Sequence, residues 1–153
     1  MYQRILVAMD KSTKESEGAI IIAKNFLAPT GEGILLEVIP PGAPLTVSIF
    51  TVPAFQVEQE NCANAMVNLG FLADRLNQVS GRWRVKVAVS NSVAEMSVDL
   101  AIREKVDLIA MYAHDGNDTA RLAKLIEDSL AEKAPRPAFI EVRVIKAREL
   151  ATA

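Results

Sequence analysis

Residues 5–12 of the chain read ILVAMDKS, and this stretch decides the expected fold. Five consecutive apolar residues, Ile5 to Met9, are typical of a strand that is buried on both faces. The run ends at Asp10, and Ser12-Thr13-Lys14-Glu15 then fits a capping box, in which Ser12 accepts a hydrogen bond from a backbone N–H of the first helical turn. A buried strand, a short turn and a helix are therefore predicted in that order.

The rest of the chain repeats this alternation. Further strands are predicted at 33–39, 83–89, 108–111 and 138–145, and the first helix is expected to end at Pro29 and Gly31. Between residues 42 and 53 turn-forming residues interrupt an apolar segment, which predicts a long loop that can include a short helical or extended piece. Two later helices have apolar stripes: Cys62, Ala65, Met66, Leu69, Leu72, Ala73 and Leu76 on the first, and Leu122, Leu125, Ile126 and Ser129 on the second.

This order of elements predicts an α/β fold. Right-handed crossovers give a five-stranded parallel, doubly wound sheet in the order 3-2-1-4-5 with helices on both faces. We expect a single domain over residues 1–147 and a short solvated tail at 148–153. Ligands of such sheets bind where neighbouring strands send their connections in opposite directions, so the loops after Met9 and Met111 are the predicted functional region.

Composition excludes several classes of protein. One cysteine and one histidine among 153 residues rule out an internal disulfide and a Cys/His zinc site within one copy. A net charge of −2 argues against nucleic acid as the main partner. No apolar run approaches the ~18 residues of a membrane span, and the first ten residues do not resemble a signal peptide. We expect a cytoplasmic protein in which Cys62 packs in the core.

Several segments resemble the universal stress protein family. The first strand is similar to that family's opening ILVAVDGS, and Leu35-Leu36-Glu37-Val38-Ile39-Pro40-Pro41 is similar to its second strand. Ala94-Glu95, residues 101–111 and Ala134-Pro135-Arg136-Pro137 match later motifs in register, so only residues 42–82 lie outside the resemblance. The resemblance implies the same five-stranded fold and a homodimer formed through the last strand.

Members of that family that bind ATP carry a phosphate loop after the fourth strand, with GTHG, then nine residues, then Gly-Ser. Here the matching positions read Tyr112-Ala113-His114-Asp115 and Leu125-Ile126, so the motif glycines are missing. A shift by one residue brings in Gly116, and a gap brings in Ser129 after Asp128, but neither restores the spacing. Glycine lets a backbone approach phosphates closely, and the carboxylates of Asp115 and Asp118 repel them. ATP binding is therefore predicted to be weak or absent.

Two positions of the family's nucleotide site are retained. Asp10 matches the acidic residue beside the adenosine, and Val38 matches the second-strand position that lies against the adenine. Lys11 replaces a family glycine and is placed either to contact a phosphate or to pair with Asp115. The full candidate site for a nucleotide is Asp10, Lys11, Val38, Ala113, His114, Asp115 and Gly116.

Two other kinds of chemistry are weaker alternatives. Asp10, Ser12 and His114 form a conceivable hydrolytic set, but Ser12 fits a capping role and no nucleophile-elbow sequence surrounds it. Asp10, Asp115 and Asp118 have the oxygen ligands that Mg²⁺ prefers, although loop aspartates more often cap helices. We therefore expect no catalytic residue, no resident metal and no cofactor, with ATP or AMP and Mg²⁺ as the alternative.

Two surfaces are candidates for protein partners. The last strand, Phe139 to Ile145, has an alternating face and an unpaired edge that are suited to pairing with a second copy. The apolar segment Leu45 to Phe55 either closes over the sheet as a lid or covers a partner. The leading hypothesis is a non-enzymatic, homodimeric stress-response and signalling module, and the alternative is a nucleotide-binding member with a remodelled phosphate loop.

Overall fold

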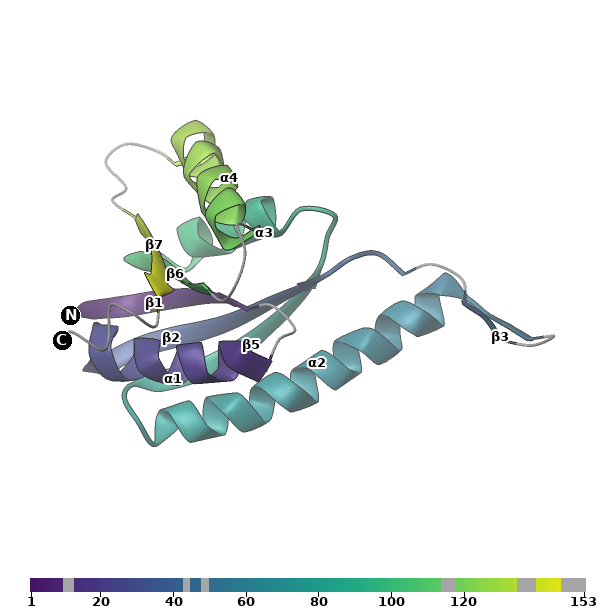
Figure 1. Ribbon diagram of the computed structural model, residues 1–153, viewed down its shortest axis with the longest axis horizontal. Helices are drawn as coiled ribbons and strands as arrows, with labels where there is room; N and C mark the ends of the chain where they lie inside the picture. Colours follow the sequence, from purple (N-terminus) through teal and green to yellow (C-terminus); the bar gives the residue numbers. More distant parts are fainter. Residues whose placement is uncertain (10–12, 43–44, 48–49, 114–117, 135–139, 147–153) are drawn as a thin grey trace.

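A computed structural model describes residues 1–9, 13–42, 45–47, 50–113, 118–134 and 140–146. Five strands form one parallel sheet in the order β5-β2-β1-β6-β7 (Figure 1). The strands are β1 (Tyr2–Met9), β2 (Leu27–Ile39), β5 (Arg82–Val89), β6 (Leu108–Ala113) and β7 (Glu141–Lys146). This confirms the predicted order 3-2-1-4-5, with the third strand of the sheet at one edge.

Helices cover both faces of the sheet. α1 (Thr13–Phe26) and α2 (Ala54–Asn77) lie on one face, and α3 (Val93–Arg103) and α4 (Asp118–Lys133) lie on the other (Figure 1). Because successive side chains of a strand point to opposite faces, β1 contributes to two separate cores. Ile5, Val7 and Met9 pack with α1 and α2, whereas Leu6 and Ala8 pack with α3 and α4.

The boundary between the first helix and the second strand differs from the prediction. α1 ends at Phe26, and β2 begins at Leu27, so that Pro29 and Gly31 lie inside the strand. The partner of Tyr2 is Leu27 and the partner of Arg4 is Glu32, which is an irregular register. This irregularity accommodates the turn-forming residues without ending the strand.

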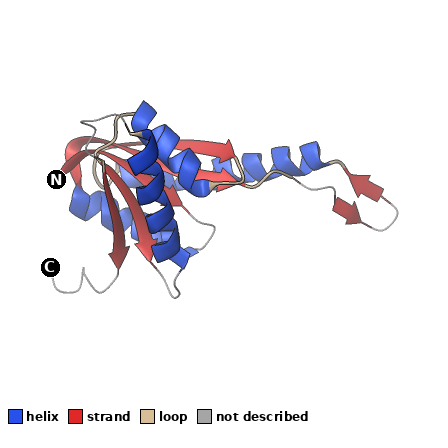
Figure 2. Ribbon diagram, turned by 90° about the horizontal axis from the view of Figure 1, so that it is seen from above, coloured by secondary structure: helices blue, strands red, loops and turns tan. Residues whose placement is uncertain are grey.

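The segment predicted as a long loop contains regular structure. β3 (Leu45–Val47) and β4 (Phe50–Val52) pair antiparallel as a hairpin, and α2 starts at Ala54. Both views place this hairpin beyond the end of the sheet, on an extension that it forms with the first half of α2 (Figures 1 and 2). It projects from the domain and does not cover the sheet as a lid would.

Two helical stripes also differ from their predictions. The buried residues of α2 are Ala65, Leu69, Leu72, Ala73 and Leu76, whereas Cys62 is half-buried and Met66 is exposed. Cys62 lies among residues 54–64 of α2, where no residue is buried, whereas Met66 lies on the outward side of the helix beside buried Ala65. In α4 the buried residues are Ala123, Ile126 and Leu130, and Leu125 is exposed, because the buried stripe lies one position away from the predicted one.

The predicted pairing face of the last strand packs against the chain's own elements. Ile145 is fully buried, the Arg143 guanidinium lies 4.9 Å from the centre of the Phe26 ring, and Glu141 accepts a hydrogen bond from Tyr2. Phe139 lies outside the described residues. Among the described helices, none is both long and apolar enough to cross a membrane.

Candidate functional site

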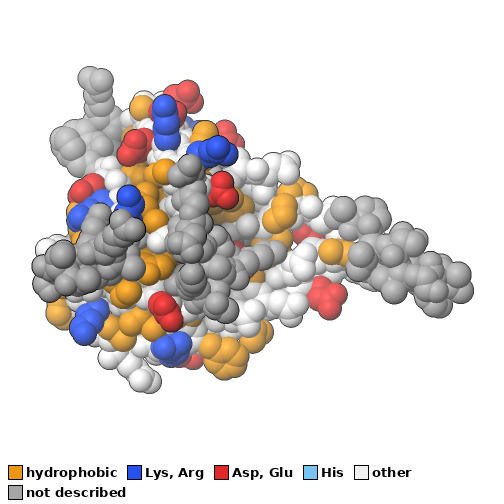
Figure 3. Space-filling model, viewed as in Figure 1, with side chains coloured by type: hydrophobic (Ala, Val, Ile, Leu, Met, Phe, Trp, Pro, Cys, Tyr) orange, Lys and Arg blue, Asp and Glu red, His pale blue; other side chains and the backbone are white. Residues whose placement is uncertain are grey.

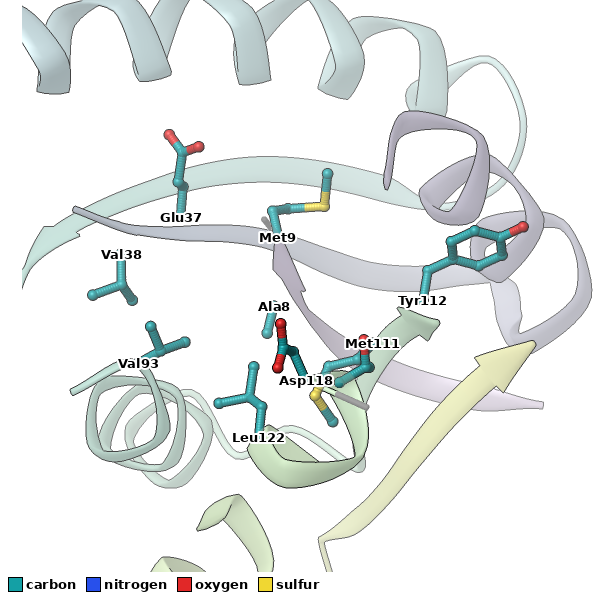
Figure 4. A pocket seen from close by; sticks show the side chains of 10 residues that line it. Ala8, Met9, Glu37, Val38, Val93, Met111, Tyr112, Asp118 and Leu122 are labelled. Atoms are coloured by element: carbon teal, nitrogen blue, oxygen red, sulfur yellow. The ribbon is translucent and has the colours of Figure 1, made fainter. Parts of the chain in front are cut away.

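A cleft of about 400 Å³ opens at the carboxyl ends of the central strands (Figure 4). β1 and β6 are neighbours there, and their connections leave toward opposite faces of the sheet. This is the switch point at which open α/β sheets bind ligands. The cleft is lined by Ala8, Met9, Glu37, Val38, Val93, Met111, Tyr112, Asp118, Thr119 and Leu122.

Apolar side chains form the walls of this cleft on the α3 and α4 side. Ala8 from β1 and Met111 from β6 are buried, and Val38 from β2 is half-buried. Val93 at the start of α3 faces Val38, and Leu122 of α4 lies below them (Figure 4). Such walls are suited to a flat apolar group and offer few polar contacts.

One charged side chain reaches into this apolar space. Asp118 is the first residue of α4, and its carboxylate points toward Ala8 in Figure 4. A carboxylate in the first turn of a helix is stabilised by the positive end of the helix dipole. The same helix end would otherwise attract a phosphate, so Asp118 places a negative charge where a phosphate would bind.

The opposite side of the strands has a different character. Glu37 is nearly buried and points away from Val38, toward the α1 and α2 side (Figure 4). Tyr112 is also buried, and its ring lies against Gly18 of α1. A Cβ atom at residue 18 would come within 2.3 Å of the Tyr112 ring, so this contact requires glycine.

The Gly18–Tyr112 contact was missed by the sequence reasoning. Tyr112 occupies the position of the first motif glycine, and the structure shows that the large ring is accommodated by a missing side chain on α1. The available signal was a glycine inside a predicted helix, which costs helix stability and often marks a close approach.

The predicted site residues fall into two groups. Val38 lines the cleft, and Ala113 is the half-buried last residue of β6. Asp10, Lys11, His114, Asp115 and Gly116 lie outside the described residues, as does Ser12. The hydrolytic set and two of the three magnesium candidates therefore have no described geometry. Within the described part of the chain, no group of three or more His, Cys, Asp or Glu residues is placed to hold a metal ion.

The residues that correspond to the family's Gly-Ser lie inside a helix. α4 runs without a break from Asp118 to Lys133, and it includes both Leu125-Ile126 and Asp128-Ser129. Backbone amides inside an α-helix donate to carbonyls four residues earlier. These residues therefore have no free amides with which to bind a phosphate group.

The fold and the position of the cleft define a small doubly wound α/β protein with a cleft at the switch point of its parallel sheet. The family model described as "Universal stress protein family" matches residues 1–146. The chain therefore belongs to the universal stress protein family, which confirms the resemblance found in the sequence.

Solved structures have the same fold at low sequence identity. The hypothetical protein MJ0577 is 20% identical with a TM-score of 0.69, and the match covers 95% of this chain and 96% of that one. UspA from Lactobacillus plantarum is 18% identical with a TM-score of 0.63, covering 94% and 97%. A universal stress protein family protein from Arabidopsis thaliana, solved with AMP bound, is 16% identical with a TM-score of 0.58, covering 96% and 94%. No curated protein matches the sequence.

Proposed function

We propose that this chain is a non-enzymatic stress-response and signalling module that acts as a homodimer and binds ATP weakly or not at all. The observation that carries the proposal is the start of α4. Asp118 brings a carboxylate into the cleft, and the helix continues unbroken through the positions where phosphate-binding amides are needed.

Electrostatics and hydrogen bonding both disfavour a triphosphate in this cleft. A carboxylate close to a phosphate repels it, and because Asp118 is exposed this repulsion is moderate. The amides at residues 125–126 and 128–129, which match the family's Gly-Ser, are used inside the helix, and the first turn of α4 carries the Asp118 carboxylate. The cleft therefore favours a ligand with little negative charge on its α4 side.

A nucleotide with fewer phosphates is the second candidate. The Arabidopsis thaliana relative was solved with AMP bound, and the apolar walls around Val38 and Val93 are suited to an adenine-sized ring. In this alternative, Lys11 or a divalent ion takes over the role of the missing glycine amides. ATP or AMP with Mg²⁺ would then be the ligand.

Thermal-shift titration with adenosine, AMP and Mg-ATP tests the proposal. A ligand at 100 times its Kd stabilises the folded state by about 2.7 kcal/mol, which raises Tm by several degrees for a chain of this size. We expect no shift with millimolar Mg-ATP. A dose-dependent shift with Mg-ATP would contradict the proposal, and a shift with AMP alone would support the second candidate.

Charge removal at the cleft provides a matched comparison. Asp118→Asn should increase AMP affinity several-fold, because it removes the carboxylate nearest the expected phosphate position. Asp128→Asn removes an exposed carboxylate from the same helix, outside the residues that line the cleft, and should leave the affinity unchanged. Equal effects of the two substitutions would mean that Asp118 has no local role.

The non-enzymatic assignment has its own test. Hydrolytic activity that is present in the parent protein and lost in His114→Ala would contradict it.

The homodimer is proposed to form through the edge of β7. β7 pairs only with β6 in the described sheet, and unpaired strand edges tend to pair with another chain. A groove of about 500 Å³ beside it is lined by Glu127, Leu130, Ala131, Ala134, Ile140, Glu141 and Val142. Ile140→Lys should halve the mass of the assembly measured by sedimentation. Ile102→Lys, at a half-buried isoleucine of the same core on α3, should not.

A further inference from the structure

The outward side of α2 carries large apolar side chains that face solvent. Phe71 is 68% exposed, Val67 58% and Met66 48%. Exposed Ala63 lies on the same side, and a Cβ atom at Gly70 would meet nothing within 4 Å. We call these five residues the α2 stripe. Hydrophobic side chains project from this edge of the molecule, along the line of α2, in Figure 3.

The stripe also lacks charge. The thirteen residues from Asn61 to Ala73 include no Asp, Glu, Lys or Arg. The outward face of a helix in a soluble domain is normally charged, whereas the cores of protein–protein interfaces are depleted in charge. The α2 stripe therefore has the composition of a contact surface.

The first half of α2 has no core within one copy of the chain. Residues 54–64 include no buried side chain, and all buried residues of the helix lie from Ala65 onward. This half and the β3–β4 hairpin project together beyond the sheet (Figures 1 and 2). Because a two-stranded hairpin is at best marginally stable alone in water, the extension requires a further surface to pack against.

We propose that the α2 stripe is a second self-association surface, on which two copies of the chain cross antiparallel about a twofold axis near Val67. Ala63, Val67 and Phe71 follow one another at a spacing of four residues, which forms the ridge used in the commonest class of helix packing. A twofold at Val67 sets Ala63 of each copy against Phe71 of the partner subunit. A small residue thus receives a large one, as a self-complementary interface requires.

The charges at the two ends of the stripe favour the antiparallel direction. Glu58 and Glu60 precede it, and Asp74 and Arg75 follow it. Parallel helices would bring the acidic ends of the two copies together. Antiparallel helices set each acidic end against Asp74 and Arg75 of the partner subunit, whose charges cancel, and the helix dipoles are also opposed.

The extension would supply part of the area that a stable interface needs. Stable interfaces bury about 800 Å² per partner, which is more than one crossing of two helices provides. α2 has 24 residues and is about 36 Å long, so each extension would lie along the other copy and enlarge the contact. This surface is independent of the proposed β7 edge, because α2 packs beside β5 at the opposite end of the sheet.

Sedimentation equilibrium of the whole chain tests this inference. Phe71→Asp should halve the mass of the assembly, from tetramer to dimer if the β7 edge also pairs and from dimer to monomer if it does not. Asn68→Asp adds the same charge at an exposed position of α2 outside the stripe and should leave the mass unchanged. A monomeric parent protein, or an assembly that Phe71→Asp leaves intact, would overturn the inference.

Cross-linking locates the surface independently of the β7 edge. In a Cys62→Ser background, Val67→Cys places two thiols at the proposed axis, and oxidised glutathione should convert most of the protein to a covalent dimer. Leu125→Cys on α4 is the control, because its parent side chain is also 58% exposed. Cross-linking of both variants to the same extent, or of neither, would contradict a twofold at Val67.

Discussion

Gly18 and Tyr112 explain how a bulky residue occupies a position where relatives that bind ATP have glycine. The absent side chain of Gly18 provides the space for the Tyr112 ring. A glycine inside a helix signals a close approach, but the sequence could not identify Tyr112 as its partner, because only the packing of α1 on β6 brings them together. The identity of a residue at the edge of the cleft is thus determined by a glycine in a distant helix.

Substitution of Gly18 tests this contact. Gly18→Ala should destabilise the fold by about 1–3 kcal/mol, because the added methyl group displaces the Tyr112 ring. Gly70→Ala is the matched control, since its methyl group has open space, and in dilute protein it should stabilise the fold by about 0.5–1 kcal/mol. Both values come from urea unfolding, and equal effects would show that the Tyr112 contact is not tight.

Tyr2 links the start of β1 to β7, and its hydroxyl makes the free energy of unfolding depend on pH in the alkaline range. Its hydrogen bond to the Glu141 carboxylate, together with partial burial, raises the pKa of the Tyr2 hydroxyl above the ordinary value of about 10. The fold therefore favours the protonated hydroxyl. This contribution is complete below about pH 10 and is lost as the pH rises through the pKa of the folded state.

Tyr2→Phe should remove that dependence. The free energy of unfolding of the parent protein should exceed that of the variant by a constant amount at neutral pH, and the difference should shrink above about pH 10. Urea unfolding measured across this range provides both values. A difference that stays constant at high pH would exclude this role of the hydroxyl.

At the scale of elements, the strands were predicted better than the helices. A strand that is buried on both faces has a continuous apolar run, and β1 and β6 were found from such runs. A helical stripe shows which residues share a face but not where the underlying sheet ends. This is why Cys62 was wrongly assigned to the core, whereas Met66 was wrongly assigned because the buried face of α2 is narrower than the apolar stripe.

The wall of the cleft formed by α3 depends on a helix cap. The Ser92 hydroxyl accepts a hydrogen bond of 3.2 Å from the backbone N–H of Glu95, and Val93 beside it lines the cleft. Ser92→Ala should cost about 1 kcal/mol, which lowers Tm by ~2–4 °C for a domain of this size. Asn91→Ala, one residue before the cap, should cost less than half as much. A Tm equal to that of the parent protein would show that the cap is dispensable.

At the scale of the whole molecule, topology predicted the place of the site but not its chemistry. The order of strands and helices placed the switch point between the first and fourth strands of the sheet, and the cleft lies there. Val38, identified through the family resemblance, is one of its walls. A helix through residues 122–129 was predicted and is present, whereas the direction of the Asp118 carboxylate could not be predicted, because it depends on where the helix starts relative to the sheet.

The extension formed by the first half of α2 and the hairpin could not be predicted from the sequence pattern. An apolar segment predicts that its side chains are buried. The pattern does not show whether they are buried in the core of one chain or in an interface between two chains. The segment that suggested a lid lies, where the structure describes it, on the extension that would enlarge the proposed contact between copies.

The amount of nucleotide that the protein retains tests the central claim most directly. The whole chain would be incubated with millimolar Mg-ATP, desalted and denatured in acid, and the released nucleotide would be quantified by anion-exchange chromatography. We predict far less than one ATP per chain, and a higher yield when Asp118→Asn is loaded with AMP. Recovery of one ATP per chain from the parent protein would contradict the claim that Asp118 and the unbroken α4 exclude a triphosphate.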